Sequence, residues 1–118
     1  MPGKLTNKLG TIIIDDQVLA SIAGASAMEC YGLVGMAAKS ATGGLVELLM
    51  REHSSKGVKV HTYDDTIVVD LFVIVEFGTR ISVVANNIIE KVKYNIEHLT
   101  GMNVKKVNIN VQGVRIEK

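Results

Sequence analysis

The stretch VKVHTYDDTIVVDLFVIVEFG, residues 58–78, decides the fold. It holds two runs rich in β-branched residues, separated by Asp64-Asp65, a pair typical of turns. The pattern predicts two strands, residues 58–63 and 66–77, with Gly78 ending the second. Successive side chains point to opposite faces of a strand, so the second strand has one strongly apolar face. That face carries Ile67, Val69, Leu71, Val73, Val75 and Phe77.

An amphipathic helix is predicted after these strands, because apolar residues recur at helical spacing from residue 81 to residue 99. Lys91, Lys93 and Glu97 lie away from that apolar stripe. We expect Thr79 or Ser82 to cap the first turn and Gly101 to end the helix. The predicted buried stripe is Ile81, Val84, Ala85, Ile88, Val92, Ile96 and Leu99.

A last strand is predicted over residues 104–116, where apolar and polar side chains alternate. One face of this strand is apolar and the other is uncharged and polar. The apolar face would carry Val107, Ile109 and Val111, and the polar face Asn108, Asn110 and Gln112.

The first half of the chain predicts smaller elements. A β-branched run at residues 11–14 indicates a strand, and Asp15 or Asp16 can cap a helix over residues 17–30. That helix is rich in small residues, and we expect its Gly24 to approach another backbone closely. The rest is predicted as a short strand at 31–36, a connector at 39–44, a short amphipathic helix at 45–52 and a loop at 53–57.

The predicted order is β-α-β-(α)-β-β-α-β in a single domain over residues 1–118. Two long helices need a sheet against which to bury their apolar faces, so the expected fold is an α+β two-layer sandwich. The order of the strands within the sheet stays open at this point.

The composition argues for a cytoplasmic protein that does not bind nucleic acid. The net charge is +1 and aromatic residues make up 4% of the chain, whereas nucleic-acid binders need basic surfaces or aromatic stacking platforms. A single cysteine cannot form an internal disulfide. The N-terminus has no apolar signal core, and no uncharged apolar run is long enough to span a bilayer.

The residue types that most often carry chemistry lack the spacing that chemistry needs. His53, His61 and His98 form none of the tight pairs typical of zinc ligands. Cys30 is the last residue of the helix predicted over 17–30, at the end where the dipole disfavours a thiolate, so we interpret it as a buried structural residue. The pairs Asp15-Asp16 and Asp64-Asp65 are explained by a helix cap and a turn. We therefore expect no enzyme activity, and no catalytic, cofactor or metal site.

A glycine motif leaves an alternative function open. Gly32-Leu33-Val34-Gly35 matches the bare GxxG loop with which KH domains clamp a nucleic-acid backbone. The two middle residues are apolar and no Lys or Arg is adjacent, which favours a buried strand or tight turn. A KH-like RNA-binding domain is the alternative, and a small hydrolase or ligand-binding protein is the third hypothesis. Gly43-Gly44 is not followed by the lysine of a Walker motif.

The second face of the sheet is the predicted contact surface. A two-layer domain would leave this face in water, although it carries several apolar residues. An apolar centre with a polar rim is the usual anatomy of an interface. The candidate interface is Val68, Phe72, Ile74, Asn108, Asn110 and Gln112, with Phe72 as its anchor. The alternative is that the helix predicted at residues 45–52 covers this face and buries Phe72 in the core.

Segments along nearly the whole chain resemble the alkaline-shock, envelope-stress-response family of Gram-positive bacteria, in its YloU-like branch. These segments occur in the family's order, and their combination is more specific than any one of them. They are ECYGLVGM (29–36), KGVKV (56–60), VIVEFGTRI (73–81), LTGMNV (99–104) and VNINVQGV (107–114).

The resemblance implies a non-catalytic cytoplasmic protein that is tied to envelope stress and acts through protein–protein contacts. Some members are held at the membrane by a separate anchor protein. The YloU-like branch is often encoded beside a dihydroxyacetone-kinase-like, fatty-acid-kinase-type protein. The implied partner is therefore an anchor protein or such a kinase-like protein. Self-association into a homo-oligomer is a further expectation, and it rests on the second face of the sheet. No cofactor, nucleic acid or direct membrane insertion is expected.

Overall fold

A computed structural model describes residues 3–39, 46–49, 51–63 and 65–116. Most of the connector predicted at 39–44, including Gly43-Gly44, and Asp64 of the predicted turn lie outside the described residues. The described elements are β1 (Gly3–Asn7), β2 (Gly10–Ile14), α1 (Asp16–Met28), β3 (Leu33–Lys39), β4 (Val46–Leu49), a 3₁₀ helix η1 (Arg51–Gly57), β5 (Val58–Tyr63), β6 (Thr66–Glu76), α2 (Ile81–Thr100) and β7 (Asn103–Arg115).

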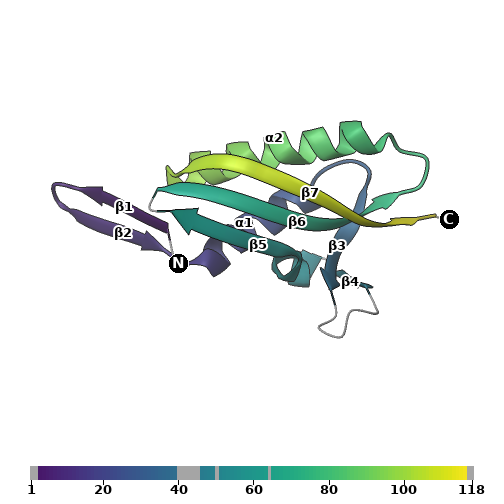
Figure 1. Ribbon diagram of the computed structural model, residues 1–118, viewed down its shortest axis with the longest axis horizontal. Helices are drawn as coiled ribbons and strands as arrows, with labels where there is room; N and C mark the ends of the chain where they lie inside the picture. Colours follow the sequence, from purple (N-terminus) through teal and green to yellow (C-terminus); the bar gives the residue numbers. More distant parts are fainter. Residues whose placement is uncertain (1–2, 40–45, 50, 64, 117–118) are drawn as a thin grey trace.

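Strand β6 is the centre of the main sheet (Figure 1). One of its edges pairs with β7, in parallel, along the whole strand. The other edge is shared by β5 and β3, both antiparallel, and β4 extends the sheet beyond β3. The β6–β7 pair is parallel because α2 carries the chain back to the start of β6, as a crossover helix does.

Both long helices pack on one face of this sheet, so the predicted two-layer α+β arrangement is confirmed (Figure 1). The core joins the inward face of β6 to four residues of α2: Val84, Ile88, Val92 and Ile96. The predicted apolar runs extend too far at their ends. Phe77 lies beyond β6 and is 67% exposed, and Leu99 in the last turn of α2 is 66% exposed. Ile81 in the first turn is also exposed.

Two of the three predicted helix ends are confirmed. Asp15 caps α1, because its carboxylate accepts a hydrogen bond from the Gln17 N–H at 3.3 Å. Gly101 ends α2 with a left-handed φ of 79°, a conformation that favours glycine. The predicted Thr79 or Ser82 cap of α2 is wrong: the N-cap residue is Arg80, which makes no side-chain cap bond. The Thr79 hydroxyl donates instead to the Glu76 carbonyl at 2.7 Å.

The helix predicted at residues 45–52 is also wrong. Residues 46–49 form β4, which pairs with β3 in antiparallel register, and η1 follows from Arg51. An apolar run of this length is compatible with either a strand or a helix, and here the free edge of β3 decides for the strand. The alternative in which this helix covers Phe72 therefore falls, because the described residues 46–49 form a strand.

Gly24 of α1 meets another backbone closely, as predicted. A Cβ atom at this position would lie 2.8 Å from the Ser54 Oγ and 3.0 Å from the Ser54 carbonyl carbon. The small residues of α1 thus let η1 lie directly against the helix.

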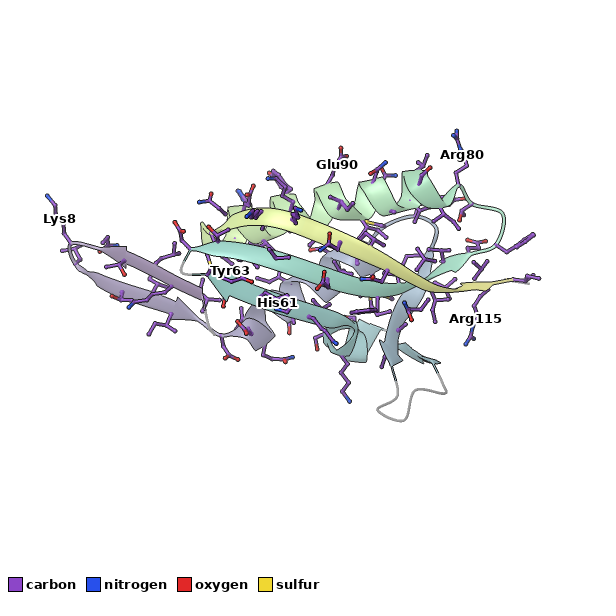
Figure 2. The ribbon with its side chains drawn as sticks, viewed as in Figure 1. Lys8, His61, Tyr63, Arg80, Glu90 and Arg115 are labelled. Atoms are coloured by element: carbon purple, nitrogen blue, oxygen red, sulfur yellow. The ribbon has the colours of Figure 1, made fainter. Side chains whose placement is uncertain are left out.

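The hairpin of β1 and β2 extends away from the main sheet (Figure 1), and only its second strand was predicted. Its turn is held by Asn7, whose side-chain oxygen accepts hydrogen bonds from the N–H groups of Leu9 at 2.8 Å and Gly10 at 3.1 Å. Lys8 marks the tip in Figure 2. Ile12 and Ile13 are both exposed, so this arm leaves apolar side chains in water.

Candidate functional site

The sheet has an open face, which we define as the side of β5, β6 and β7 that points away from the helices. Its side chains come from strands far apart in the sequence and are brought together by the pairing of β6 with both neighbours. Asp70 pairs with Asn108 on one side and Lys59 on the other, and Phe72 pairs with Asn110. The open face therefore includes Lys59, His61, Tyr63, Thr66, Val68, Asp70, Phe72, Lys106, Asn108 and Asn110.

Polar side chains link the three strands across this face. Asp70 lies at the centre: its Oδ1 accepts a hydrogen bond from the Asn108 Nδ2 at 2.8 Å, and its Oδ2 lies 3.4 Å from the His61 Nε2. Asn110 donates from its Nδ2 to the Leu71 carbonyl at 3.2 Å. Figure 2 shows His61 on β5, beside β6. These contacts hold the polar part of the face in one arrangement.

Phe72 forms the apolar centre of the open face. Its ring is half-buried, and the Lys59 ammonium lies 5.6 Å from the ring centroid, within the range of a cation–π contact. A hollow of about 140 Å³ adjoins the ring and is lined by Ala37, Ala38, Lys56, Lys59 and Phe72. The hollow combines an apolar wall with two ammonium groups, so it suits an apolar side chain that has an acidic group beside it.

Two predicted interface residues are placed differently from the others. Ile74 is only 3% exposed. Gln112 has no partner in β6, because Val111 pairs with Val73 and Gly113 with Ile74, which makes Gln112 a β-bulge. The alternation predicted through Gln112 therefore stops at Val111.

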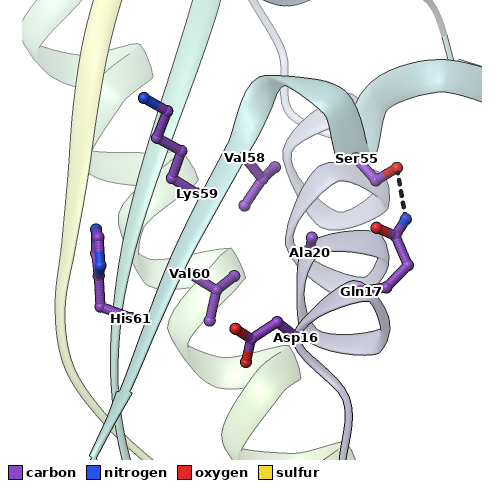
Figure 3. Close-up of a pocket in the computed structure, with 8 residues that line it drawn as sticks. All are labelled: Asp16, Gln17, Ala20, Ser55, Val58, Lys59, Val60 and His61. Atoms are coloured by element: carbon purple, nitrogen blue, oxygen red, sulfur yellow. Dashed lines mark hydrogen bonds between the residues drawn. The ribbon is translucent and has the colours of Figure 1, made fainter. Parts of the chain in front are cut away.

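A second hollow, of about 340 Å³, lies between α1 and β5 (Figure 3). Val58 and Val60 point into it from β5, whereas Lys59 and His61 point to the other side of the strand. Gln17 closes one side by donating from its Nε2 to the Ser55 Oγ at 3.1 Å. Its lining holds no cysteine, and its histidine is turned toward Asp70 on the open face.

Cys30 lies at the far end of α1 from this hollow. Its thiol is half-buried, rather than buried as predicted, and lies 3.6 Å from the Ser26 carbonyl oxygen. Partial burial raises the pKa of Cys30, Lys91 opposes that shift and Glu29 adds to it. A raised pKa keeps the sulfur as the unreactive thiol near neutral pH, which agrees with a structural role.

The histidines are spread over the fold. His53 lies in η1, and its side chain is outside the described residues. His98, in the last turn of α2, stacks on Tyr94 with ring centroids 5.5 Å apart. Among the side chains that the structure describes, no three His, Cys, Asp or Glu residues come close enough to hold a metal ion. Within the same residues, no helix has the length and apolar character needed to cross a membrane.

The GxxG motif begins with Gly32 in the turn from α1 into β3, and its other three residues open β3. Gly32 and Gly35 are buried. Gly32 has a φ of 88°, and a Cβ atom there would lie 2.6 Å from the Val84 Cγ2 of α2. A turn at Gly32 that packs against α2, followed by the start of β3, accounts for the motif and agrees with the predicted strand or tight turn.

Comparison with known proteins adds the family context. Residues 4–116 match the model of the alkaline shock protein family, described as having a cell envelope-related function. The chain is 46% identical to the uncharacterized protein YloU of Bacillus subtilis, over 96% of this chain and 95% of YloU. It is 40% identical to the uncharacterized protein Spy1614 of Streptococcus pyogenes, over 98% of this chain and 97% of the relative. It is 33% identical to the uncharacterized B. subtilis protein YqhY, over 92% of this chain and 80% of YqhY. No solved structure matches the chain.

Proposed function

This chain belongs to the alkaline shock protein family, whose function is related to the cell envelope, and on that premise we propose that it acts there without catalysis, by binding a protein partner through its open face. The proposal places it in the cytoplasm, near the membrane when a partner is membrane-bound. One observation carries it: Phe72 stands half-buried at the centre of a face that no described helix covers, beside Lys59 and a small hollow.

The arrangement of the open face favours protein binding over catalysis. Aromatic anchors that insert into or beside a small hollow dominate the binding energy of many interfaces. The polar groups around Phe72 are paired with one another across strands, which suits a preformed docking surface more than an acid–base site. Lys56 and Lys59 at the hollow favour a partner segment that carries an acidic residue next to an apolar one.

The partner that we propose first is a dihydroxyacetone-kinase-like, fatty-acid-kinase-type protein, and the second is a membrane anchor protein. Both follow from the family resemblance, and the open face supplies the surface that either would contact. A bound anchor would bring the chain to the membrane, although no described helix can cross it.

Replacing Phe72 with lysine tests the proposal. Phe72→Lys removes the aromatic anchor and places a third ammonium near Lys56 and Lys59, so the affinity for the kinase-like protein should fall at least about tenfold, or about 1.4 kcal/mol. The measurement is calorimetric titration of the two purified proteins. Tyr94→Lys is the matched control, because Tyr94 is an exposed aromatic on α2.

Circular dichroism separates a binding defect from a folding defect. Phe72→Lys should keep the wild-type spectrum, and Tyr94→Lys should bind as the wild type does. Wild-type affinity of the Phe72→Lys variant, or loss of its fold, would reject the open face as the docking surface. A wild-type chain that does not bind the kinase-like protein would reject that partner and leave the anchor protein to be titrated in the same way.

A further inference from the structure

Strand β7 has an edge that no other strand covers. Within the described residues it pairs only with β6, along residues 103–115. A long strand with a free edge presents a row of unpaired N–H and C=O groups, and proteins usually protect such edges with charges, prolines or bulges. The question for this strand is therefore which part of its edge is protected and which is not.

The first part of the edge is protected by α2. The Val104 N–H donates to the Glu97 Oε2 at 3.0 Å, and the Lys93 Nζ donates to the Val104 carbonyl at 3.4 Å. Both backbone groups of Val104 thus point away from β6 and find partners on the helix. In the described part of β7, Val104 is the one residue whose own N–H and C=O receive such side-chain partners.

Two bulges then divide β7. The register with β6 skips Lys105 and skips Gln112, and between them it is regular from residue 106 to residue 111. Backbone direction alternates along a regular strand and shifts by one at a bulge. Val104 points to the free edge, and the bulge at Lys105 shifts the alternation by one residue. The backbones of Val107, Ile109 and Val111 therefore also point to the free edge. The other end of β7 gives the same result. The Arg115 carbonyl accepts a hydrogen bond from the Phe77 N–H at 2.7 Å, so Arg115 points toward β6. Alternating back from Arg115, with a shift of one at Gln112, again leaves Val111 pointing to the free edge.

The unprotected segment 107–111 is self-complementary. It reads Val-Asn-Ile-Asn-Val, a palindrome centred on Ile109, and it contains no charge and no proline. A two-fold axis through Ile109 would place Val107 against Val111 of a second copy, Ile109 against Ile109 and Asn108 against Asn110. Isologous two-fold interfaces need this kind of self-matching surface.

We propose that the chain forms a two-fold dimer in which the β7 edges of two copies pair antiparallel about Ile109. The three outward-facing residues form the hydrogen-bonded pairs of the ladder, and each such pair exchanges two bonds. Ile109 and Val111, which are half-buried in one copy, would meet the same residue types of the other copy on the helix side. Lys106 would stand opposite Gln112, so no like charges face each other.

The dimer would join two sheets into one and place two open faces side by side. It concerns the edge of β7 and not the contact made by Phe72, so it can fail while the proposed function stands. It places self-association at the edge of β7, whereas the sequence pattern predicted it on the second face of the sheet.

A charge exchange at positions 108 and 110 tests both the pairing and its register. These positions directly oppose each other across the proposed axis, with Cβ atoms about 4.5–5.5 Å apart. In Asn108→Lys/Asn110→Lys, two pairs of like charges face each other and the dimer should dissociate. In Asn108→Lys/Asn110→Glu, each introduced lysine faces an introduced glutamate and the dimer should persist.

The readout is the mass of the purified chain by light scattering, over a range of concentrations, with thermal unfolding to show that both variants fold. The wild type and the lysine–glutamate variant should show twice the 12.7 kDa of one chain. The lysine–lysine variant should need at least about tenfold higher concentration to do so. A monomeric wild type, or equal dimerisation of both double variants, would overturn the proposal.

Discussion

An Ile88→Asp variant is expected to lose about 6 kcal/mol of unfolding free energy at neutral pH. Ile88 is fully buried at the middle of α2, where burial of such a side chain is worth about 1.5–3 kcal/mol. At pH 7 an aspartate there must stay protonated, roughly three pH units above its usual pKa of about 3.9, which costs about 4 kcal/mol more. The loss of about 6 kcal/mol equals the lower bound of total stability for a chain of 118 residues, about 6–18 kcal/mol.

The matched control is Val83→Asp, on the same helix but 45% exposed. An acidic residue in the first turn is favourable to the helix dipole, so this variant should unfold within about 1 kcal/mol of the wild type. Urea unfolding followed by circular dichroism compares the two. If Ile88→Asp unfolded at the same urea concentration as Val83→Asp, α2 could not be packed as described.

A Gly32→Ala variant should lose about 2–5 kcal/mol of unfolding free energy. Two effects add at this position. A φ of 88° costs an alanine about 1–2 kcal/mol, and its Cβ would lie 2.6 Å from the Val84 Cγ2, which adds about 1–3 kcal/mol of overpacking. Val84 is buried and cannot easily turn away.

Gly78→Ala isolates the first of these effects. Gly78 has a φ of 94°, but nothing lies within 4 Å of the added Cβ. This variant should therefore lose only about 1–2 kcal/mol. Equal losses for the two alanine variants in urea unfolding would mean that Gly32 does not contact α2, and the packing explanation of the GxxG motif would then fail.

Local patterns predicted the elements that have strong periodicity. The strands of residues 58–63 and 66–77, and the helix that Gly101 ends, lie within one or two residues of β5, β6 and α2. Alternation and helical spacing are local properties, and the core enforces them where one face is buried. The errors lie at the ends of these runs, where Phe77 and Leu99 are apolar but have no neighbour to cover them.

Non-local pairing was beyond these patterns. Residues 46–49 form a strand because β3 offers an edge, and nothing within those residues excludes a helix. The bulges at Lys105 and Gln112 are defined by the register of β7 against β6, which the sequence of β7 alone does not contain. The parallel β6–β7 pair, which brings Asn108 to Asp70, likewise follows from the crossover through α2.

The candidate site was predictable in part. Strand alternation alone placed Val68 and Phe72 on the same face of one strand, and Asn108 and Asn110 on the same face of another. The register of β6 with β7 then brings the two pairs together. The position of Lys59 over the Phe72 ring requires the pairing of β5 with β6 and was not predicted. Alternation did not predict that Ile74 is buried, or that a bulge at Gln112 interrupts the pattern of β7.

Site-specific photocrosslinking in the native cell tests the central claim most directly. A benzophenone amino acid would replace Phe72 on the open face or, as the control, Tyr94 on the exposed side of α2, and mass spectrometry would identify each adduct. The open-face account predicts a discrete protein adduct from position 72 and none of the same mass from position 94. An adduct of equal yield from both positions, or one from position 94 alone, would contradict the account.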